Sequence, residues 1–251
     1  MRIDVLLGPE AVTPAPVAGR AVAVIDVLRA SVTIAAALAH GARSIVPLAS
    51  LEDVRERAKN FDRSEVCLAG ERAMHPVPGF DLGNSPKDFT REAVDGKTVL
   101  LSTTNGTQAL ARIRGAREVV VASYVNLSAV TAVLARAAGE GTDITLVCAG
   151  RDGQVSLEDS ACAGRYVRRL LAMVPAIELG DGAVACSMLD QRYDGQLDRL
   201  FAESEHGRAL AAAGYTADLE VCRAVDSIPV VPVFADSRVT LAEAAMGRAV
   251  R

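Results

Sequence analysis

Short, nearly unbroken apolar runs alternate along the chain with segments whose apolar positions repeat at helical spacing. The apolar runs predict strands over Ala21–Leu28, Ser44–Leu48, Val66–Ala69, Thr98–Ser102, Glu118–Ala122 and Asp143–Cys148. The segments between them predict helices over Val32–His40, Leu51–Phe61, Thr107–Ile113, Leu127–Ala138 and Leu157–Met173. Strands and helices that alternate at this spacing are typical of parallel sheets. We therefore expect an α/β fold, a three-layer α/β/α architecture with a largely parallel sheet.

The last third of the chain has a different pattern. From Ala185 it predicts two helices followed by "SIPVVPVF", Ser227–Phe234, whose prolines favour an edge strand or an extended segment. We interpret residues 1–251 as a single α/β unit, and leave open whether the part from about residue 185 forms a sub-lobe. An exposed edge strand is compatible with a symmetric homodimer.

One linker, Gly70–Phe89, is too long for a simple strand–helix connection. It holds three prolines and three glycines, and a loop of this length in a compact domain is usually functional or disordered. Its mixture of apolar and charged residues argues against disorder. We expect Gly79–Pro86 to cover a bound substrate, with Asp81 and Asn84 joining the site when the loop closes.

Composition and charge narrow the class of protein. Half of the 251 residues are hydrophobic but only 4 % are aromatic, which suits a core of Val, Leu, Ile and Ala. The net charge of -4 gives no basic surface for nucleic acid, and no run approaches the ~20 apolar residues of a membrane span. The amino terminus does not resemble a signal peptide, and five cysteines without CxxC spacing fit reduced thiols. A cytoplasmic protein is expected.

Polar residues follow four of the predicted strands. Asp26, Arg29 and Ser31 follow the first strand, and Glu71 and Arg72 follow the third. The turn Ser102–Thr107 follows the fourth strand, and Cys148–Gly153, with Arg151, follows the sixth and leads to Glu158 and Asp159. Because ligands bind beyond the carboxyl ends of parallel strands, we expect one active site there.

These residue types suit a phosphorylated ligand. Carboxylates without a histidine partner are the ligands that Mg²⁺ prefers, and a Thr/Asn/Gly turn at a helix start offers N–H groups to an anion. Arginine adds a planar fork for phosphate, sulfonate or carboxylate. Together, these residues predict that the protein binds a small, highly anionic organophosphate together with a divalent metal ion.

Each feature also has a structural explanation. Asp26 would serve as a helix cap, although Ser31 already offers one; Glu71 and Arg72 would form a surface ion pair. Thr103–Thr107 would merely start a helix, and Glu158 and Asp159 would suit any first helical turn. Their joint occurrence at strand ends favours a functional site.

Other phosphatase signatures are absent from the sequence. Asp26 is not followed by a second aspartate two residues later, as a haloacid-dehalogenase-type enzyme requires. Cys162 and Arg168 have the C-x5-R spacing but lie within a predicted helix. His40, His75 and His206 lack metal-ligand spacing, and there is neither a Walker A nor a GxGxxG motif.

Several ordered motifs resemble one family over about residues 3–240. They are "VIDVLRAS", "GER", "GFDLGNSP", "TTNGT", "CAG" followed by "EDSACAG", and a late frame with Ala217, Asp218, Cys222, Asp226 and Val231–Phe234. They are similar to those of the 2-phosphosulfolactate phosphatases, the ComB-like proteins. The resemblance implies Mg²⁺-dependent hydrolysis of 2-phospho-3-sulfolactate to 3-sulfolactate and phosphate, a step towards coenzyme M. Another phosphorylated hydroxy acid is the alternative substrate.

The resulting hypothesis gives each candidate residue a role. The expected Mg²⁺ ligands are Asp26 and Glu71, completed by Asp81, Glu158 or Asp159. Arg29 and Arg72, with Thr103, Thr104, Asn105, Gly106 and Thr107, would hold the phosphate, while Arg151 and Asn84 would contact the rest of the substrate. The nucleophile is a water molecule, or in a variant Asp26 itself. The second class of function that these residues allow is a regulatory protein that binds a phosphorylated metabolite without catalysis.

Overall fold

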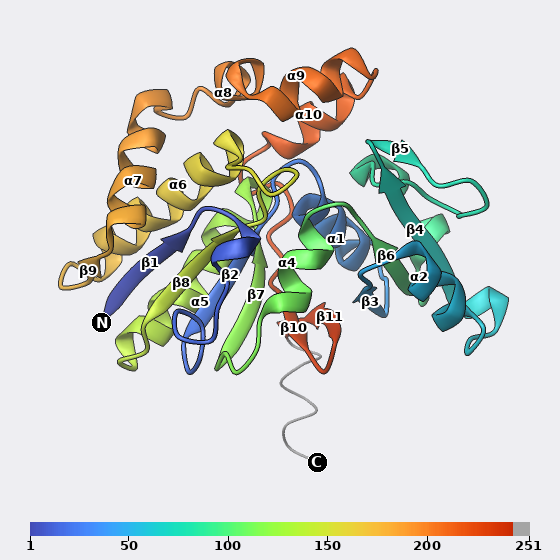
Figure 1. The fold of residues 1–251 in the computed structure, drawn as a ribbon, viewed down its shortest axis with the longest axis horizontal. Helices are drawn as coiled ribbons and strands as arrows, with labels where there is room; N and C mark the ends of the chain where they lie inside the picture. Colours follow the sequence, from blue (N-terminus) through green and yellow to red (C-terminus); the bar gives the residue numbers. More distant parts are fainter. Residues whose placement is uncertain (243–251) are drawn as a thin grey trace.

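The computed structural model describes residues 1–242, which form an eleven-stranded sheet with helices on both faces (Figure 1). The strands are β1 (Arg2–Leu6), β2 (Ala21–Ile25), β3 (Ser44–Pro47), β4 (Val66–Arg72), β5 (His75–Pro76), β6 (Thr98–Ser102), β7 (Glu118–Ala122), β8 (Ile144–Cys148), β9 (Glu178–Leu179), β10 (Pro232–Ala235) and β11 (Arg238–Leu241). The α-helices are α1 (Ala30–Ala39), α2 (Leu51–Ala58), α3 (Arg91–Val94), α4 (Gly106–Arg112), α5 (Leu127–Gly139), α6 (Leu157–Met173), α7 (Asp181–Tyr193), α8 (Leu197–Glu203), α9 (Glu205–Ala212) and α10 (Thr216–Cys222). The expected α/β fold is confirmed.

The sheet consists of two parallel groups joined by an antiparallel hairpin. Its strand order is β5-β4-β6-β3-β11-β10-β7-β2-β8-β1-β9. Strands β4, β6 and β3 are parallel to one another, as are β7, β2, β8, β1 and β9. The hairpin β10–β11 forms one backbone ladder pair with each group, Val233 with Val120 and Val239 with Ile45.

Both faces of the central strands are buried, which produces the three layers. In β2, Ala21, Ala23 and Ile25 belong to the apolar core shared with α5 and α6, while Val22 and Val24 belong to the core shared with α1 and α4. Alternate residues of a strand point to opposite faces, so a strand buried on both sides must be apolar throughout. This is why β2 is an unbroken apolar run.

Several predicted strand boundaries were wrong. The first strand ends at Ile25 rather than Leu28, because the N–H of Val27 leaves the sheet and donates to Asp159 Oδ1 at 2.8 Å. Strand β4 continues to Arg72, since Glu71 and Arg72 pair with the short strand β5. Strand β1 was not predicted, because only Ile3 and Val5 of its five residues are buried.

The last third also differs from its prediction. It contains α7, α8, α9 and α10, of which the last three lie over the upper edge of the sheet (Figure 1). Strand β10 is not an edge strand but lies between β7 and β11 within the sheet. Because β10 does not lie at an edge of the sheet, it no longer supports the expected homodimer. Leu200, Leu210 and Cys222 of this region belong to the same apolar core as the sheet.

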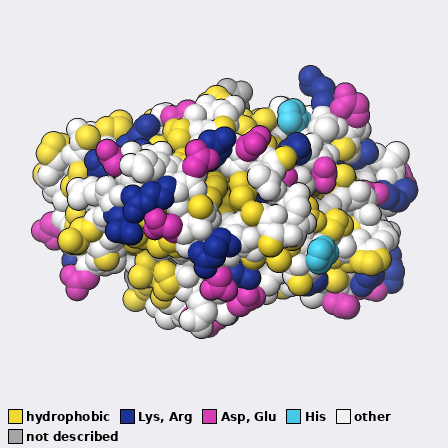
Figure 2. Space-filling view, turned by 90° about the horizontal axis from the view of Figure 1, so that it is seen from above, with side chains coloured by type: hydrophobic (Ala, Val, Ile, Leu, Met, Phe, Trp, Pro, Cys, Tyr) yellow, Lys and Arg dark blue, Asp and Glu magenta, His cyan; other side chains and the backbone are white. Residues whose placement is uncertain are grey.

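Two further expectations concern the cysteines and the membrane. All five cysteines are buried and free, so the prediction that they form no disulfide framework is confirmed. Among the helices of residues 1–242, none is both long and apolar enough to cross a bilayer. On the face of Figure 2, basic and acidic side chains are interspersed.

Candidate active site

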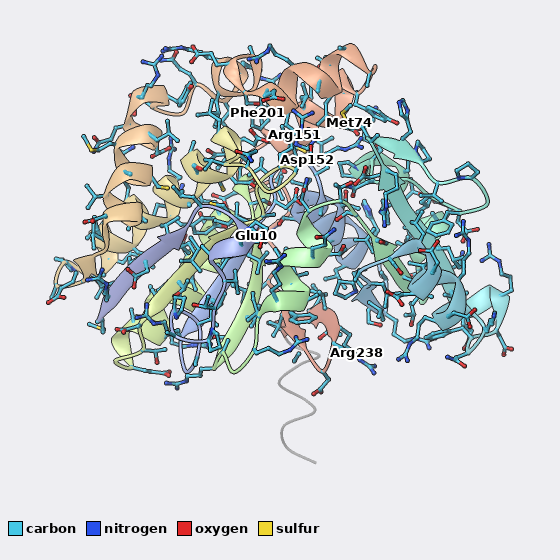
Figure 3. All side chains as sticks on the ribbon, in the orientation of Figure 1. Glu10, Met74, Arg151, Asp152, Phe201 and Arg238 are labelled. Carbon is cyan, nitrogen blue, oxygen red and sulfur yellow. The ribbon has the colours of Figure 1, made fainter. Side chains whose placement is uncertain are left out.

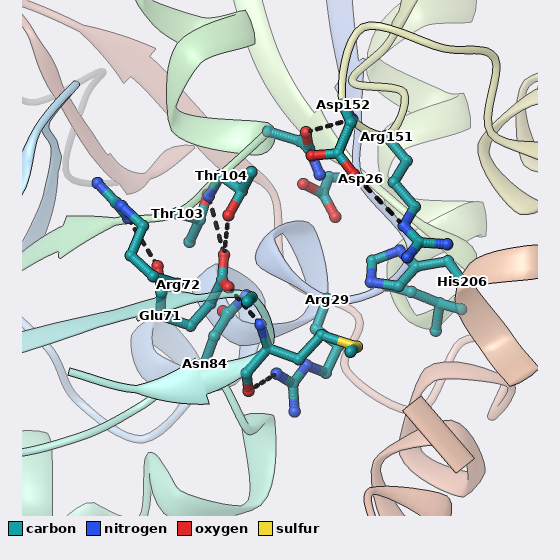
Figure 4. A pocket seen from close by; sticks show the side chains of 14 residues that line it. Asp26, Arg29, Glu71, Arg72, Asn84, Thr103, Thr104, Arg151, Asp152 and His206 are labelled. Carbon is teal, nitrogen blue, oxygen red and sulfur yellow. Dashed lines mark hydrogen bonds and ion pairs between the residues drawn. The ribbon is translucent and has the colours of Figure 1, made fainter. Parts of the chain in front are cut away.

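A cavity of about 300 Å³ opens where the carboxyl ends of β2, β4, β6 and β8 lie beneath α9. Figure 3 shows Met74, Arg151 and Asp152 meeting in this region, below the helices of the last third. The predicted residues that line it are Asp26, Arg29, Glu71, Arg72, Asn84, Thr103, Thr104, Asn105 and Arg151 (Figure 4). The structure thus brings together residues from both parallel groups of the sheet.

Asp26 follows β2 and has one oxygen free for a ligand. Its Oδ1 accepts a hydrogen bond from the N–H of Ala30 at 3.1 Å, and its own N–H donates to Ser31 Oγ. The prediction that Ser31 caps the helix was wrong, because Ser31 Oγ is turned back to Asp26 and Asp26 itself bonds the first turn. Burial raises the pKa of Asp26 to about 6; the charge of His206 opposes this shift, and Glu71 and Glu158 add to it.

Glu71 is a fixed carboxylate at the end of β4. Its Oε1 accepts from the N–H and the hydroxyl of Thr104, at 2.8 and 2.9 Å, and its Oε2 accepts from the N–H of Met74 at 2.9 Å. Glu71 therefore joins the turn after β6 to the turn after β4.

Hydrogen bonds within the turn Thr103–Thr107 hold its shape, and two of its backbone N–H groups donate to no acceptor among the described residues. Thr103 and Thr107 exchange hydrogen bonds between side chain and backbone, including Thr107 N–H to Thr103 Oγ1 at 3.3 Å. Within the described residues, the N–H groups of Asn105 and Gly106 have no acceptor. Thr107 is thus a structural member of the turn rather than part of the cavity wall.

Gly106 is required by close packing, not by an unusual backbone angle. A Cβ at this position would lie 2.6 Å from Asp26 Oδ2 and 2.7 Å from the Cβ of Ala30. The turn after β6 therefore lies directly against the free oxygen of Asp26, which brings carboxylate and anion-binding N–H groups to one point.

The three predicted arginines have different surroundings. Arg29 is buried, and its guanidinium pairs with Asp218 Oδ2 at 2.5 Å and lies over the ring of Tyr215. Arg72 is turned to the edge of the cavity (Figure 4). There it donates to Ser102 Oγ at 3.0 Å. Arg151 pairs with Glu205 of α9 at 3.0 Å and lies at the opposite wall.

The buried pair of Arg29 and Asp218 gives a stability prediction. Asp218→Ala would leave the Arg29 charge buried without its partner, which costs about 3–5 kcal/mol. We expect a lowered midpoint in urea unfolding. As a control, Glu56→Ala, which removes the exposed pair with Lys59, is expected to leave the midpoint unchanged. Equal unfolding midpoints for the two variants would contradict a stabilising role for the buried pair of Arg29 and Asp218.

The proposed lid is fastened to the sheet. The N–H of Gly70 donates to Leu82 O, and the N–H groups of Asp81 and Leu82 donate to Leu68 O. Asn84 lines the cavity, and its Oδ1 is buried without a hydrogen-bond partner, so the amide keeps unused capacity there. The structure does not bring Asp81 into the cavity, because its carboxylate pairs with Arg63 and accepts from the N–H of Leu68.

Glu158 and Asp159 lie behind the cavity rather than in its wall. Asp159 accepts from the N–H groups of Val27 and Gly150, at 2.8 and 3.1 Å, and so ties together the segments after β2 and β8. Burial, with the nearby charges of Asp26 and Glu158, raises the pKa of Asp159 well above its usual value. The carboxylate of Glu158 faces His206, with Oε1 3.5 Å from Nδ1.

Sequence reasoning missed five residues in the cavity wall. They are Leu28, Ala73, Met74, Asp152 and His206, of which Asp152 and His206 can ionise. His206 was set aside for lack of metal-ligand spacing, and it reaches the site because α9 lies over the strand ends. The only sequence signal that linked the last third of the chain to the site was the group of motif residues that includes Asp218.

Whether the site suits a metal ion depends on the donor atoms that have no hydrogen-bond partner. Among residues 1–242 there is no group of three or more Asp, Glu, His or Cys side chains that could hold an ion by themselves. The free donor atom at the centre is Asp26 Oδ2, with Glu71 beside it. Both residues offer carboxylate oxygens. This suits an Mg²⁺ ion that is bound by one or two carboxylates together with substrate phosphate and water.

Comparison with known proteins places nearly the whole chain among relatives of one name. Residues 7–237 match the family model described as 2-phosphosulpholactate phosphatase. A protein of Symbiobacterium thermophilum named "Probable 2-phosphosulfolactate phosphatase" is 39% identical over 226 residues, which cover 90% of this chain and 96% of that protein. Proteins of the same name from Thermotoga petrophila and a Synechococcus strain are 38% and 42% identical, over 96% and 92% of this chain and 99% and 95% of their own lengths.

Proposed function

The chain belongs to the 2-phosphosulpholactate phosphatase family, whose members are phosphoric monoester hydrolases, and we propose that it hydrolyses 2-phospho-3-sulfolactate or a closely related phosphorylated hydroxy acid. The products are the hydroxy acid and phosphate. We propose that Mg²⁺ is the cofactor.

The observation that supports this proposal best is the meeting of Asp26 with the turn after β6. A carboxylate oxygen and two unused N–H groups lie together at Gly106, with arginines on the surrounding wall. A protein that only binds an anion gains nothing from a buried carboxylate beside it, because the two charges repel. A metal-dependent phosphatase needs both.

Each residue then has a definite task. Asp26 and Glu71 would hold the metal, which when bound neutralises phosphate charge and supplies Lewis acidity. The N–H groups of Asn105 and Gly106 would donate to phosphate oxygens, and Arg29 adds positive charge. A water molecule is the nucleophile. Arg151, on the opposite wall, would contact the sulfonate or carboxylate of the substrate.

Removal of the metal tests the cofactor. We expect phosphate release from racemic 2-phosphosulfolactate to stop in EDTA and to return when Mg²⁺ is added in excess, because few protein ligands hold the ion. Phosphate is measured in time courses at fixed substrate. Release that continues unchanged in EDTA would contradict the metal. Release from other phosphorylated hydroxy acids but not from this one would keep the reaction and change the substrate.

A further inference from the structure

One titratable side chain in the cavity wall has no role in the mechanism above. His206 lies in the first turn of α9 and is mostly buried. It borders the cavity described above and also a second cavity of about 350 Å³. Figure 4 shows His206 beside Arg151, across the cavity from Glu71 and Thr104. It therefore faces the side on which the organic part of the substrate would lie.

The local fold holds this histidine in place. Ser204 caps α9, since its Oγ accepts from the N–H of Gly207 at 2.9 Å. A Cβ on Gly207 would lie 2.1 Å from the carbonyl oxygen of Phe201, so glycine lets the end of α8 and the start of α9 approach closely. The first turn of α9 is fixed by these contacts, and the imidazole is fixed with it.

A buried carboxylate lies behind the imidazole. Glu158 is only 2 % exposed and points its Oε1 at Nδ1 of His206. Burial raises the pKa of Glu158, but the hydrogen bond and the charge of His206 outweigh this and lower it below its usual value. Because the carboxylate of Glu158 faces Nδ1, Nε2 is the ring nitrogen left to act in the cavity. The other charged groups around the imidazole, from the two cavities that it borders, include Asp26, Arg151, Asp152, Glu203, Glu205 and Arg208.

The other titratable groups in the wall are less well placed to give a proton to the leaving oxygen. Arginine side chains do not give up a proton in proteins, and both carboxylate oxygens of Glu71 already accept hydrogen bonds from Met74 and Thr104. Asp152 is largely exposed to water. Asp26 lies against Gly106, at the phosphate end of the cavity. An aliphatic alkoxide leaves poorly unless it is protonated, so a proton donor on the organic side has a clear use.

We propose that His206, positioned by Glu158, donates the proton that the leaving oxygen of the substrate takes up. This inference rests on the proposed function. The bond between phosphorus and the organic oxygen breaks, its electron pair stays on that oxygen, and the imidazolium proton joins it to give the hydroxy acid. A water oxygen forms the new bond to phosphorus, and the proton that this water loses returns the imidazole to its charged form through solvent. The sum is ester plus water to hydroxy acid plus phosphate.

The test compares kcat and KM for His206→Gln and His206→Ala with those of the wild type, all with Mg²⁺ present. We expect kcat to fall about 10²-fold or more in both variants, with KM within a few-fold of the wild-type value. Added imidazole is expected to restore phosphate release in His206→Ala, where the removed ring leaves room, and not in His206→Gln. Glu158→Gln should lower kcat by a smaller factor, as a positioning residue does.

The outcomes separate this inference from the function on which it rests. A wild-type protein that releases no phosphate from any phosphorylated hydroxy acid overturns the proposed function itself. A wild type that is active, with unchanged kcat in both His206 variants, overturns only the proton donor. A loss confined to KM, or a loss of kcat that imidazole does not restore, makes His206 a binding or structural residue and equally overturns the proposal.

Discussion

Asp26→Asn is expected to lower phosphate release about 10³-fold or more, the largest effect of any single substitution in the cavity. The amide has nearly the same shape but lacks the charge that would hold a cation, and Asp26 Oδ2 is the free carboxylate oxygen beside the anion-binding turn. The measurement is kcat with saturating Mg²⁺ and substrate. Activity within tenfold of the wild type would show that Asp26 is not a ligand of the metal.

The stability of the same variant is the control for correct folding. The pKa of Asp26 is raised in the folded protein to about 6, so its ionisation opposes folding. Stability from this group is fully present below the ordinary value near 3.8 and is lost as the pH rises through about 6. Metal-free Asp26→Asn should therefore be more stable than the wild type at pH 7.5, by roughly 3 kcal/mol, with the difference vanishing near pH 4. An inactive variant that is also less stable at pH 7.5 would indicate misfolding.

Gly106→Ala is expected to lower phosphate release about 10²-fold. The new Cβ cannot lie 2.6 Å from Asp26 Oδ2, so the carboxylate and the turn must move apart. Displacements of about 1 Å in an active site cost rate on this scale. The measurement is kcat/KM for phosphate release, with the fold checked by circular dichroism.

A matched variant separates this effect from the general cost of adding a methyl group. Gly139, at the end of α5, has no atom within 4 Å of the position of a new Cβ and no left-handed backbone angle. Gly139→Ala should keep wild-type activity and unfold at the same temperature or a slightly higher one. If both alanine variants are fully active, the close contact at Gly106 has no part in catalysis.

The alternation of apolar runs and helical segments was enough to predict the three-layer fold and the strand ends that carry the site. Asp26, Glu71 and Thr104 could be found because they lie at or just after the carboxyl ends of strands in the two parallel groups, and these ends of both groups line the cavity. The motif resemblance to a phosphatase family was confirmed by the comparison of residues 7–237.

The remaining residues could not be predicted from local pattern. Glu158 and Asp159 are adjacent to the site in sequence, but their carboxylates serve His206 and two backbone N–H groups instead of the cavity. His206 reaches the cavity only through the packing of α9 over the sheet, a contact between residues far apart in the chain. The prolines of Ser227–Phe234 suggested an edge, yet β10 pairs with β11 at four positions and with β7 at one, Val233 with Val120.

The hairpin β10–β11 also bears on the order in which the site can be assembled during synthesis. It lies between the group of strands that leads to Asp26 and the group that carries Glu71, and it forms one backbone ladder pair with each. The ribosome makes these two strands after all the others of the sheet. Each parallel group can form its own hydrogen bonds earlier, and α1 and α4 can pack against both groups in one apolar core, but the backbone pairing between the groups forms only once the hairpin is in place. A nascent chain that has emerged as far as α10 would hold every residue of the cavity wall and still lack the strands that join its two sides.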